Sequence, residues 1–227
     1  MHGVRRTIIY LYGVDMKQVA GIWLPDNDTH FAKALAESPM VDGHGTYQLA
    51  KIEKCLAVTE RRRVALDIGA HVGLWSMILA KHFRMVYAFE PVPQLRECWY
   101  CNTSKNALMH PYALGASCGA SEMVYIDGNS GNSRVMHSGG VQVQMVTLDS
   151  LEPIDIDFIK IDVEGYEYEV LTSGEKTIRE QNPVVLIEQK PGNAETFGRK
   201  RFDASTLLEL WGMQLLWEKA GDRCYGW

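Results

Sequence analysis

Residues 67–73 (DIGAHVG) combine two glycines with an acidic residue in a stretch that suits ligand binding. They follow the apolar run 64–68 and precede a helical pattern at 74–82, so they should form a strand–helix loop. Because glycine has no Cβ, Gly69 and Gly73 would allow a ligand to approach the main chain. In open α/β sheets, ligands bind where such loops leave the strand ends. A plain tight turn would give the same pattern.

A second acidic residue, Glu90, ends the next apolar run and stands 21 positions after Gly69 (90 − 69). An acid about 20 positions beyond such a loop is where the hydroxyls of a ribose receive hydrogen bonds. The loop lacks the G-x-G-x-x-G pattern of pyrophosphate binding, so a nucleoside without phosphates fits better than a dinucleotide. S-adenosylmethionine is such a molecule, and Asp67 would face its cationic centre or position its amino group.

Residues 159–167 (IKIDVEGYE) place acidic groups where another apolar strand ends. Asp162 should face the same crevice as the glycine-containing loop. A carboxylate there could hold an acceptor hydroxyl beside a methyl donor and help it lose its proton. Glu164 could share this role, although capping of the following helix explains it almost equally well.

Glu188 ends the apolar run 184–187 and raises the question of a metal. Together with Asp162 it could hold a divalent cation through oxygen ligands, or both could bind acceptor hydroxyls directly. We favour the interpretation without a metal. The seven histidines lack metal-ligand spacing, and the five scattered cysteines suggest neither a zinc site nor a disulfide framework.

Strand-like and helix-like patterns alternate from residue 64 onward. We expect strands at 64–68, 85–89, 109–114, 158–161 and 184–187, helices at 74–82, 93–106, 166–180 and 204–211, and a final strand pair at 214–218 and 223–227. This alternation predicts an α/β fold with a doubly wound, mostly parallel sheet.

Two regions depart from this alternation. Runs at 122–126 and 141–148 flank the glycine- and asparagine-rich loop 127–140, which predicts a β-hairpin in place of a crossover helix. Before the sheet we expect an edge strand at 7–14, helices at 29–37 and 46–58, and a loop at 38–45. We therefore divide the chain into an N-terminal extension, 1–60, that caps the acceptor pocket, and a main domain, 61–227.

The composition is that of an ordinary globular protein, with 227 residues, 46% hydrophobic and 22% charged. The formal net charge of −5 argues against a nucleic-acid partner, which usually demands a basic surface. The sequence contains no apolar run as long as a membrane span. The short run 7–14 resembles a signal peptide only weakly, so we expect a cytoplasmic protein without a membrane partner.

Four segments resemble the FkbM-type methyltransferases. They are DIGAHVG at 67–73, FEP at 89–91, TLDSL at 147–151, and IKIDVEGYE at 159–167 followed by Val-Leu at 170–171. The resemblance implies a Rossmann-like class I methyltransferase fold and O-methylation, often of sugar or polyketide hydroxyls. It also implies contacts to S-adenosylmethionine from Asp67, Gly69, Gly73 and Glu90, with the acceptor side near Asp162 and Glu164.

We assign two sets of residues to this site. The cofactor-binding set is Asp67, Gly69, Ala70, His71, Gly73, Glu90, Pro91, Ala113 and Leu114. The catalytic set is Asp162 and Glu164. The expected partner is a small-molecule or glycan hydroxyl acceptor.

Three other functions compete with this hypothesis. A nucleic-acid methyltransferase that acts on base amino groups would typically carry an Asp/Asn-Pro-Pro-aromatic string where residues 162–165 (DVEG) stand. A non-catalytic module that binds the cofactor or a nucleoside could retain the same acidic residues. A nicotinamide-dependent dehydrogenase would need the missing pyrophosphate glycines.

Overall fold

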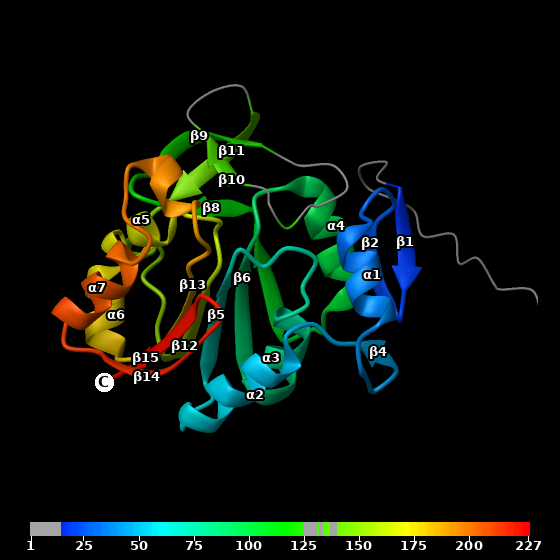
Figure 1. Cartoon of the computed structure of the whole chain (residues 1–227), viewed down its shortest axis with the longest axis horizontal. Coiled ribbons are helices and arrows are strands. Elements are labelled where there is room, and N and C mark those ends of the chain that lie inside the picture. The colour runs from blue at the N-terminus through cyan, green and yellow to red at the C-terminus, as the bar shows by residue number, and fades with distance from the viewer. Residues whose placement is uncertain (1–14, 125–130, 132–133, 137–139) are drawn as a thin grey trace, which may run out of the picture.

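The structure is a computed structural model, and it describes residues 15–124, 131, 134–136 and 140–227 (Figure 1). The strand expected at 7–14 lies outside the described residues, as does much of the loop expected at 127–140.

A seven-stranded sheet forms the centre of the molecule, in the order β14-β15-β13-β12-β5-β6-β7. Its strands are β5 (Val64–Ile68), β6 (Met85–Phe89), β7 (Ala107–His110), β12 (Ile156–Ile161), β13 (Val184–Glu188), β14 (Gln214–Lys219) and β15 (Asp222–Gly226). Strands β7, β6, β5, β12 and β13 run parallel to one another, and β15 lies antiparallel to both of its neighbours. The predicted doubly wound sheet and its final strand pair are confirmed.

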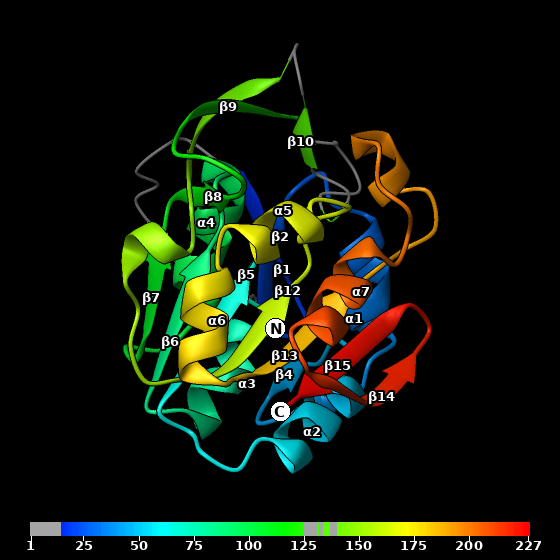
Figure 2. The same ribbon diagram turned by 90° about the vertical axis from the view of Figure 1, so that its left-hand side faces the viewer.

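Helices cover both faces of this sheet, as Figures 1 and 2 show. The helices are α2 (Leu49–Val58), α3 (Ser76–His82) and α4 (Pro93–Asn102) on one face, and α5 (Glu167–Thr172), α6 (Glu175–Gln181) and α7 (Asp203–Leu210) on the other. Successive residues of β5 take part in different cores, because side chains alternate across a strand. Ala65 packs in the cluster that includes Ile52 and Leu79, and Leu66 packs in the cluster that includes Val170 and Leu208.

Two predicted elements are each divided in the structure. The helix expected at 166–180 is α5 and α6, and the chain turns at Gly174, where a Cβ would lie 2.6 Å from the Leu148 side chain. The strand expected at 109–114 is β7 and β8 (Tyr112–Leu114), which belong to different sheets. Pro111 lies between them, and proline has no N–H with which to continue a ladder.

A second sheet follows β7, with the order β10-β9-β11-β8. Strands β9 (Gly119–Val124) and β11 (Val141–Val146) pair antiparallel, which confirms the hairpin that the sequence predicts in place of a helix. Strand β10 (Arg134–Met136) lies in the segment predicted as loop and pairs with β9. Figure 2 shows this sheet beyond one end of the central strands.

The N-terminal extension packs against the main domain. Its helices are α1 (His30–Ala36) and α2, both shorter than predicted, and short strands β3 (Met40–Val41) and β4 (His44–Gly45) lie in the expected loop. The sequence analysis missed a hairpin of β1 (Met16–Val19) and β2 (Ile22–Pro25). Fully buried Ile22, Leu24 and Leu35 share a core with Leu95 of α4, so the extension is continuous with the domain. Among the described residues, no helix has both the length and the apolar character that crossing a membrane requires.

Candidate active site

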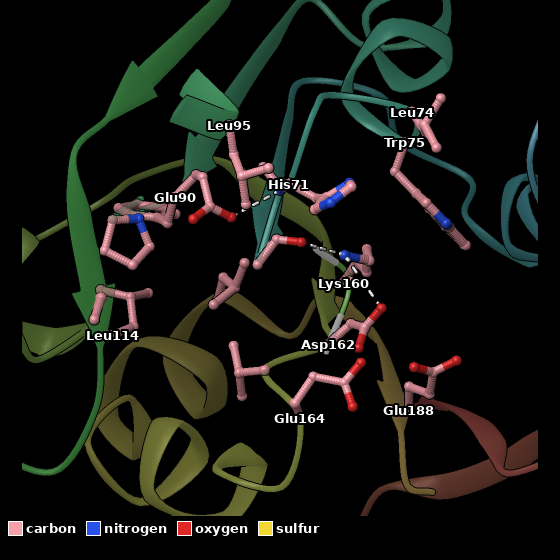
Figure 3. A pocket seen from close by; sticks show the side chains of 18 of the residues that line it. His71, Leu74, Trp75, Glu90, Leu95, Leu114, Lys160, Asp162, Glu164 and Glu188 are labelled. Carbon is pink, nitrogen blue, oxygen red and sulfur yellow. Dashed lines mark hydrogen bonds and ion pairs between the residues drawn. The ribbon is translucent and has the colours of Figure 1, made fainter. Parts of the chain in front are cut away.

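A pocket opens at the carboxyl ends of β5 and β12, where the chain order of the sheet reverses. Open α/β sheets bind ligands at this switch point. Side chains from the loops after β5, β6 and β12 and from the N-terminal extension line this pocket (Figure 3). Nine predicted site residues line it: Gly69, Ala70, His71, Glu90, Pro91, Ala113, Leu114, Asp162 and Glu164.

The loop after β5 forms one wall of the pocket and lies against the loop after β12. Gly69 has a φ of 77°, and the N–H groups of Gly69 and Ala70 both donate to the carbonyl of Phe89. A Cβ at Gly69 would overlap the carbonyl oxygen of Asp162. We expected this glycine to make room for a ligand, and the structure shows that the neighbouring loop itself requires it.

Glu90 lies at the end of β6, only 5% exposed. One carboxylate oxygen accepts a hydrogen bond from the His71 N–H at 3.0 Å, and the other accepts from the Val92 N–H at 2.9 Å. Burial raises the pKa of Glu90 to about 7 despite these bonds. Because each carboxylate oxygen has two lone pairs, both can still accept a hydrogen bond from a ligand.

Asp67 and Gly73 lie behind the pocket wall, which differs from the direct cofactor contacts expected of them. Asp67 is fully buried, accepts a hydrogen bond from the Ser76 hydroxyl at 2.6 Å and lies 3.1 Å from the Lys160 ammonium. A Cβ at Gly73 would lie 2.8 Å from the Trp99 ring. Both residues contact other parts of the protein interior, and these contacts fix the conformation of the loop.

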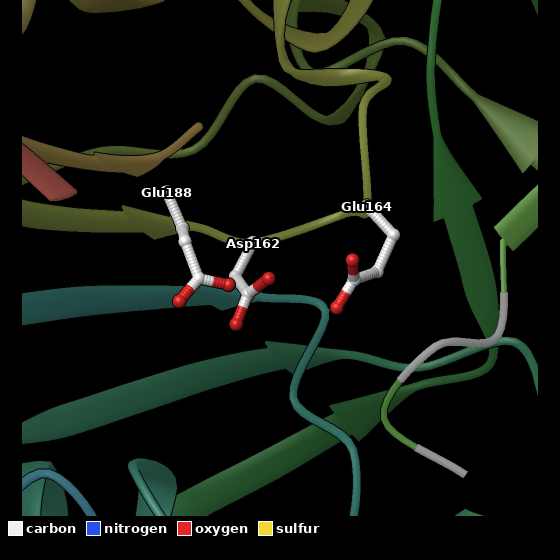
Figure 4. Close-up of side chains that lie close together, drawn as sticks. All are labelled: Asp162, Glu164 and Glu188. Atoms are coloured by element: carbon white, nitrogen blue, oxygen red, sulfur yellow. The ribbon is translucent and has the colours of Figure 1, made fainter. Parts of the chain in front are cut away.

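Three carboxyl groups meet on the opposite side of the pocket (Figure 4). Oxygen atoms of Asp162, Glu164 and Glu188 all lie within 4.8 Å of one another. The Lys190 ammonium lies 2.6 Å from Glu164 and 2.8 Å from Glu188. The Asn193 amide donates a further bond to Glu164 at 2.6 Å. Lys190 and Asn193 therefore both hold Glu164, whereas Asp162 is hydrogen-bonded to Glu188 and lies 3.9 Å from the Lys160 ammonium.

The same contacts set the protonation of the carboxyl groups. Burial, followed by the charge of Asp162, raises the pKa of Glu188 to about 8. Burial also favours a neutral Asp162, but the charges of Lys160 and Lys190, together with a hydrogen bond from Glu188 and the charge of His71, outweigh it and lower the Asp162 pKa. Near neutral pH, therefore, Glu188 holds a proton and Asp162 is ionised. Burial lowers the pKa of His71 to about 4, so its ring is uncharged there.

Sequence reasoning missed several residues around the pocket. Lys160 interrupts an apolar strand, and that break in pattern was the available signal. Phe31 and Tyr47 reach the pocket from the extension, and their rings lie 5.1 Å apart. Glu167 accepts hydrogen bonds from the Val163 and Gly165 N–H groups, so it fixes the loop that carries Glu164.

The fold is that of a class I methyltransferase. The family model described as "Methyltransferase FkbM domain" matches residues 67–223 of this chain. The chain therefore belongs to the FkbM methyltransferase family. The predicted family and fold class are thereby confirmed.

Several solved structures are similar to this chain at low sequence identity. The FkbM methyltransferase of Methylobacillus flagellatus KT is 18% identical over 73% of this chain, with a TM-score of 0.46, and the match covers 44% of that protein. This chain therefore matches under half of that protein's length. A precorrin 8W decarboxylase of Methanobacterium thermoautotrophicum is 14% identical, with coverages of 81% and 92% and a TM-score of 0.50. The N-methyltransferase NodS of Bradyrhizobium japonicum WM9, solved with S-adenosyl-L-homocysteine, is 9% identical, with coverages of 85% and 90% and a TM-score of 0.49. No curated protein matches the chain.

Proposed function

We propose that this protein uses S-adenosylmethionine to methylate a hydroxyl group of a sugar or another small molecule. The observation that carries the proposal is the arrangement of one pocket at the switch point of the sheet. Buried Glu90 lies on one side of the pocket, and the ionised carboxylate of Asp162 lies on the other side, with the Gly69 loop between them. A hydroxyl acceptor must lose a proton when it is methylated, and a carboxylate beside it is one group that can take that proton.

The pocket walls fit the chemical parts of S-adenosylmethionine. Glu90 has lone pairs available for the two ribose hydroxyls. Buried Leu95, Ala113 and Leu114 give an apolar surface beside it that suits an adenine ring. Gly69 and its neighbours would lie along the methionine part. Asp67 would act on the donor indirectly, through the shape of the loop.

Asp162 is the group that we assign to the acceptor. Bound S-adenosylmethionine would supply a methyl group on a positively charged sulfur, and the sulfur–methyl bond would break as the oxygen–methyl bond formed. The ionised Asp162 carboxylate accepts a hydrogen bond from the acceptor hydroxyl, orients its oxygen and then takes its proton. Glu164 and protonated Glu188, whose oxygens lie within 4.8 Å of those of Asp162, would bind other polar groups of the acceptor.

The extension supplies the acceptor side of the same pocket. His30, Phe31 and Tyr47 line it together with the carboxyl groups. Burial, followed by the charges of Glu188 and Asp162, raises the pKa of Tyr47, which keeps its hydroxyl protonated. We propose that residues 1–60 select the acceptor in this way, and that the acceptor is a small molecule or a glycan with no role for nucleic acid.

Calorimetric titration tests the donor site. At pH 8, where Glu90 is ionised, we expect micromolar binding of S-adenosylmethionine and S-adenosylhomocysteine and none of NAD. Replacement of Glu90 by alanine should weaken donor binding by about 1–3 kcal/mol, because hydrogen bonds to a charged group are lost. Glu195→Ala, on an exposed turn, is the matched control and should bind as the wild type does. Unchanged affinity in Glu90→Ala would contradict the ribose assignment, and no binding to the wild type would contradict the proposed function.

Exhaustive chelation tests whether a metal takes part. We expect methyl transfer to be unchanged by EDTA, because the Lys190 ammonium already lies between Glu164 and Glu188 and competes with a divalent cation. Initial rates before and after chelation, with added Mg²⁺ or Mn²⁺ as the comparison, measure this directly. Loss of activity that either ion restores would instead make the carboxyl cluster a metal site.

A further inference from the structure

Lys160 is a charged residue in the middle of the central sheet. It lies on β12 between Ile159 and Ile161, which are both fully buried, and is itself only 5% exposed. Burying an ammonium group costs several kcal/mol unless good partners surround it. A strand that needs only to pack would carry another apolar residue here. Packing alone therefore does not explain the charge at this position.

The Lys160 ammonium lies between the two loops that form the site (Figure 3). It donates a hydrogen bond to the Gly69 carbonyl at 2.8 Å, on the loop after β5. It lies 3.1 Å from Asp67 on the same side, and 3.9 Å from Asp162 on the loop after β12. One ammonium thus touches the wall of the donor pocket and the carboxylate assigned to the acceptor.

The partners of Lys160 are themselves held in place. The second oxygen of Asp67 accepts from the Ser76 hydroxyl at 2.6 Å, and that hydroxyl accepts from the Trp99 indole at 2.9 Å. All three side chains are buried. Lys160 is therefore anchored on one side by a buried hydrogen-bonded chain, and its charge faces Asp162 from a defined direction.

We propose that Lys160 is a positioning residue that sets the donor loop and the Asp162 carboxylate relative to each other through this single ammonium. The proposal rests on the proposed function, which assigns the loop after β5 to the methyl donor and Asp162 to the acceptor. On the donor side Lys160 fixes the Gly69 carbonyl. On the acceptor side its charge keeps Asp162 ionised, so that this carboxylate can accept a hydrogen bond from the acceptor hydroxyl.

Other charged and titratable groups also act on Asp162. They are Lys190 and Glu188 from β13 and the residues after it, Glu164 from its own loop, Glu167 from α5, Asp222 from β15, His71 from the donor loop and Tyr47 from the extension. Of the two lysines, Lys190 also contacts Glu164 and Glu188, whereas the partners of Lys160 are Asp67, Asp162 and the Gly69 carbonyl. Replacing Lys160 therefore changes Asp162 while the contacts among the other carboxyl groups remain.

The test uses a pair of variants that keeps the fold intact. Lys160→Met alone would leave Asp67 buried without its cation and could unfold the protein. We therefore compare Asp67→Asn with the double variant Asp67→Asn/Lys160→Met, because asparagine is neutral and can still accept from Ser76. Lys176→Met, at an exposed position on α6, is the matched control. Thermal unfolding verifies that all variants are folded.

Two measurements on this pair of variants test the two contacts of the Lys160 ammonium, one with the donor loop and one with Asp162. We expect the double variant to bind S-adenosylhomocysteine about tenfold or more weakly than Asp67→Asn, because a hydrogen bond to a charged group is lost at the donor loop. Carboxyl-carbon NMR should show the Asp162 pKa rising by about one pH unit or more, because a nearby positive charge is removed. An unchanged value of either quantity would overturn the proposal. If the wild type failed to bind S-adenosylhomocysteine, the proposed function would fail, and the Asp162 titration would still decide the electrostatic role of Lys160.

Discussion

Asp162→Asn will bind S-adenosylmethionine about as well as the wild type and will lose about 10²–10⁴-fold of its turnover. Asparagine retains the size of the side chain and can accept a hydrogen bond, but it cannot take a proton from an acceptor hydroxyl. The effect should be confined to kcat, since the cofactor contacts that we assign lie on the loop after β5 and around Glu90 at the end of β6.

The measurement is formation of S-adenosylhomocysteine with an acceptor identified in a panel of hydroxyl compounds that begins with sugars. Asp26→Asn, at an exposed position of the extension, controls for the chemistry of the substitution. Full turnover in Asp162→Asn would remove this residue from the mechanism. If the wild type bound the donor and methylated no member of a broad panel, the protein would instead be a binding module.

Gly69→Ala is the second large effect, and it concerns stability and donor binding together. The new Cβ would overlap the Asp162 carbonyl oxygen, and the φ of 77° is one that alanine rarely adopts. Left-handed strain and overpacking together should cost about 2–5 kcal/mol of unfolding free energy. Donor affinity should fall as well, because relief of the overlap must separate the two loops of the pocket.

Denaturant unfolding measures this cost, and the chain supplies a matched control. Gly192 also has a positive φ, of 86°, but a Cβ there would meet nothing within 4 Å. Gly192→Ala should therefore show the backbone strain alone, about 1–2 kcal/mol. Equal destabilisation by the two substitutions would contradict the close approach of the loops at Gly69.

The motifs of the sequence were sufficient to place most of the site. The strand–loop–helix pattern around Gly69, the acid at the end of the next strand and the acid at the end of β12 all depend on local order along the chain. Because parallel strands align their carboxyl ends at one edge of the sheet, that order alone brings Glu90 and Asp162 to one pocket. Seven of the nine predicted residues that line it follow strands of this sheet, and the other two, Ala113 and Leu114, come from β8 of the second sheet.

The interruptions of regular elements were harder to predict. The break between α5 and α6 depends on the approach of Leu148 to Gly174, which are 26 positions apart (174 − 148) in the chain. Helical periodicity continues across that point, so the pattern could not reveal it. Pro111 gave a local signal for the division of β7 from β8, but which sheet each strand joins depends on partners elsewhere in the chain.

The sequence by itself determined the family, the doubly wound sheet and the strand ends that carry Glu90 and Asp162, because these follow from short-range pattern and chain order. Only the tertiary structure decided what each of these side chains contacts. It placed Asp67 behind the pocket, brought Tyr47 into it and set Lys160 between the two loops. Those outcomes depend on which groups must share a buried volume and balance their charges there, and that balance exists only after distant segments have packed together.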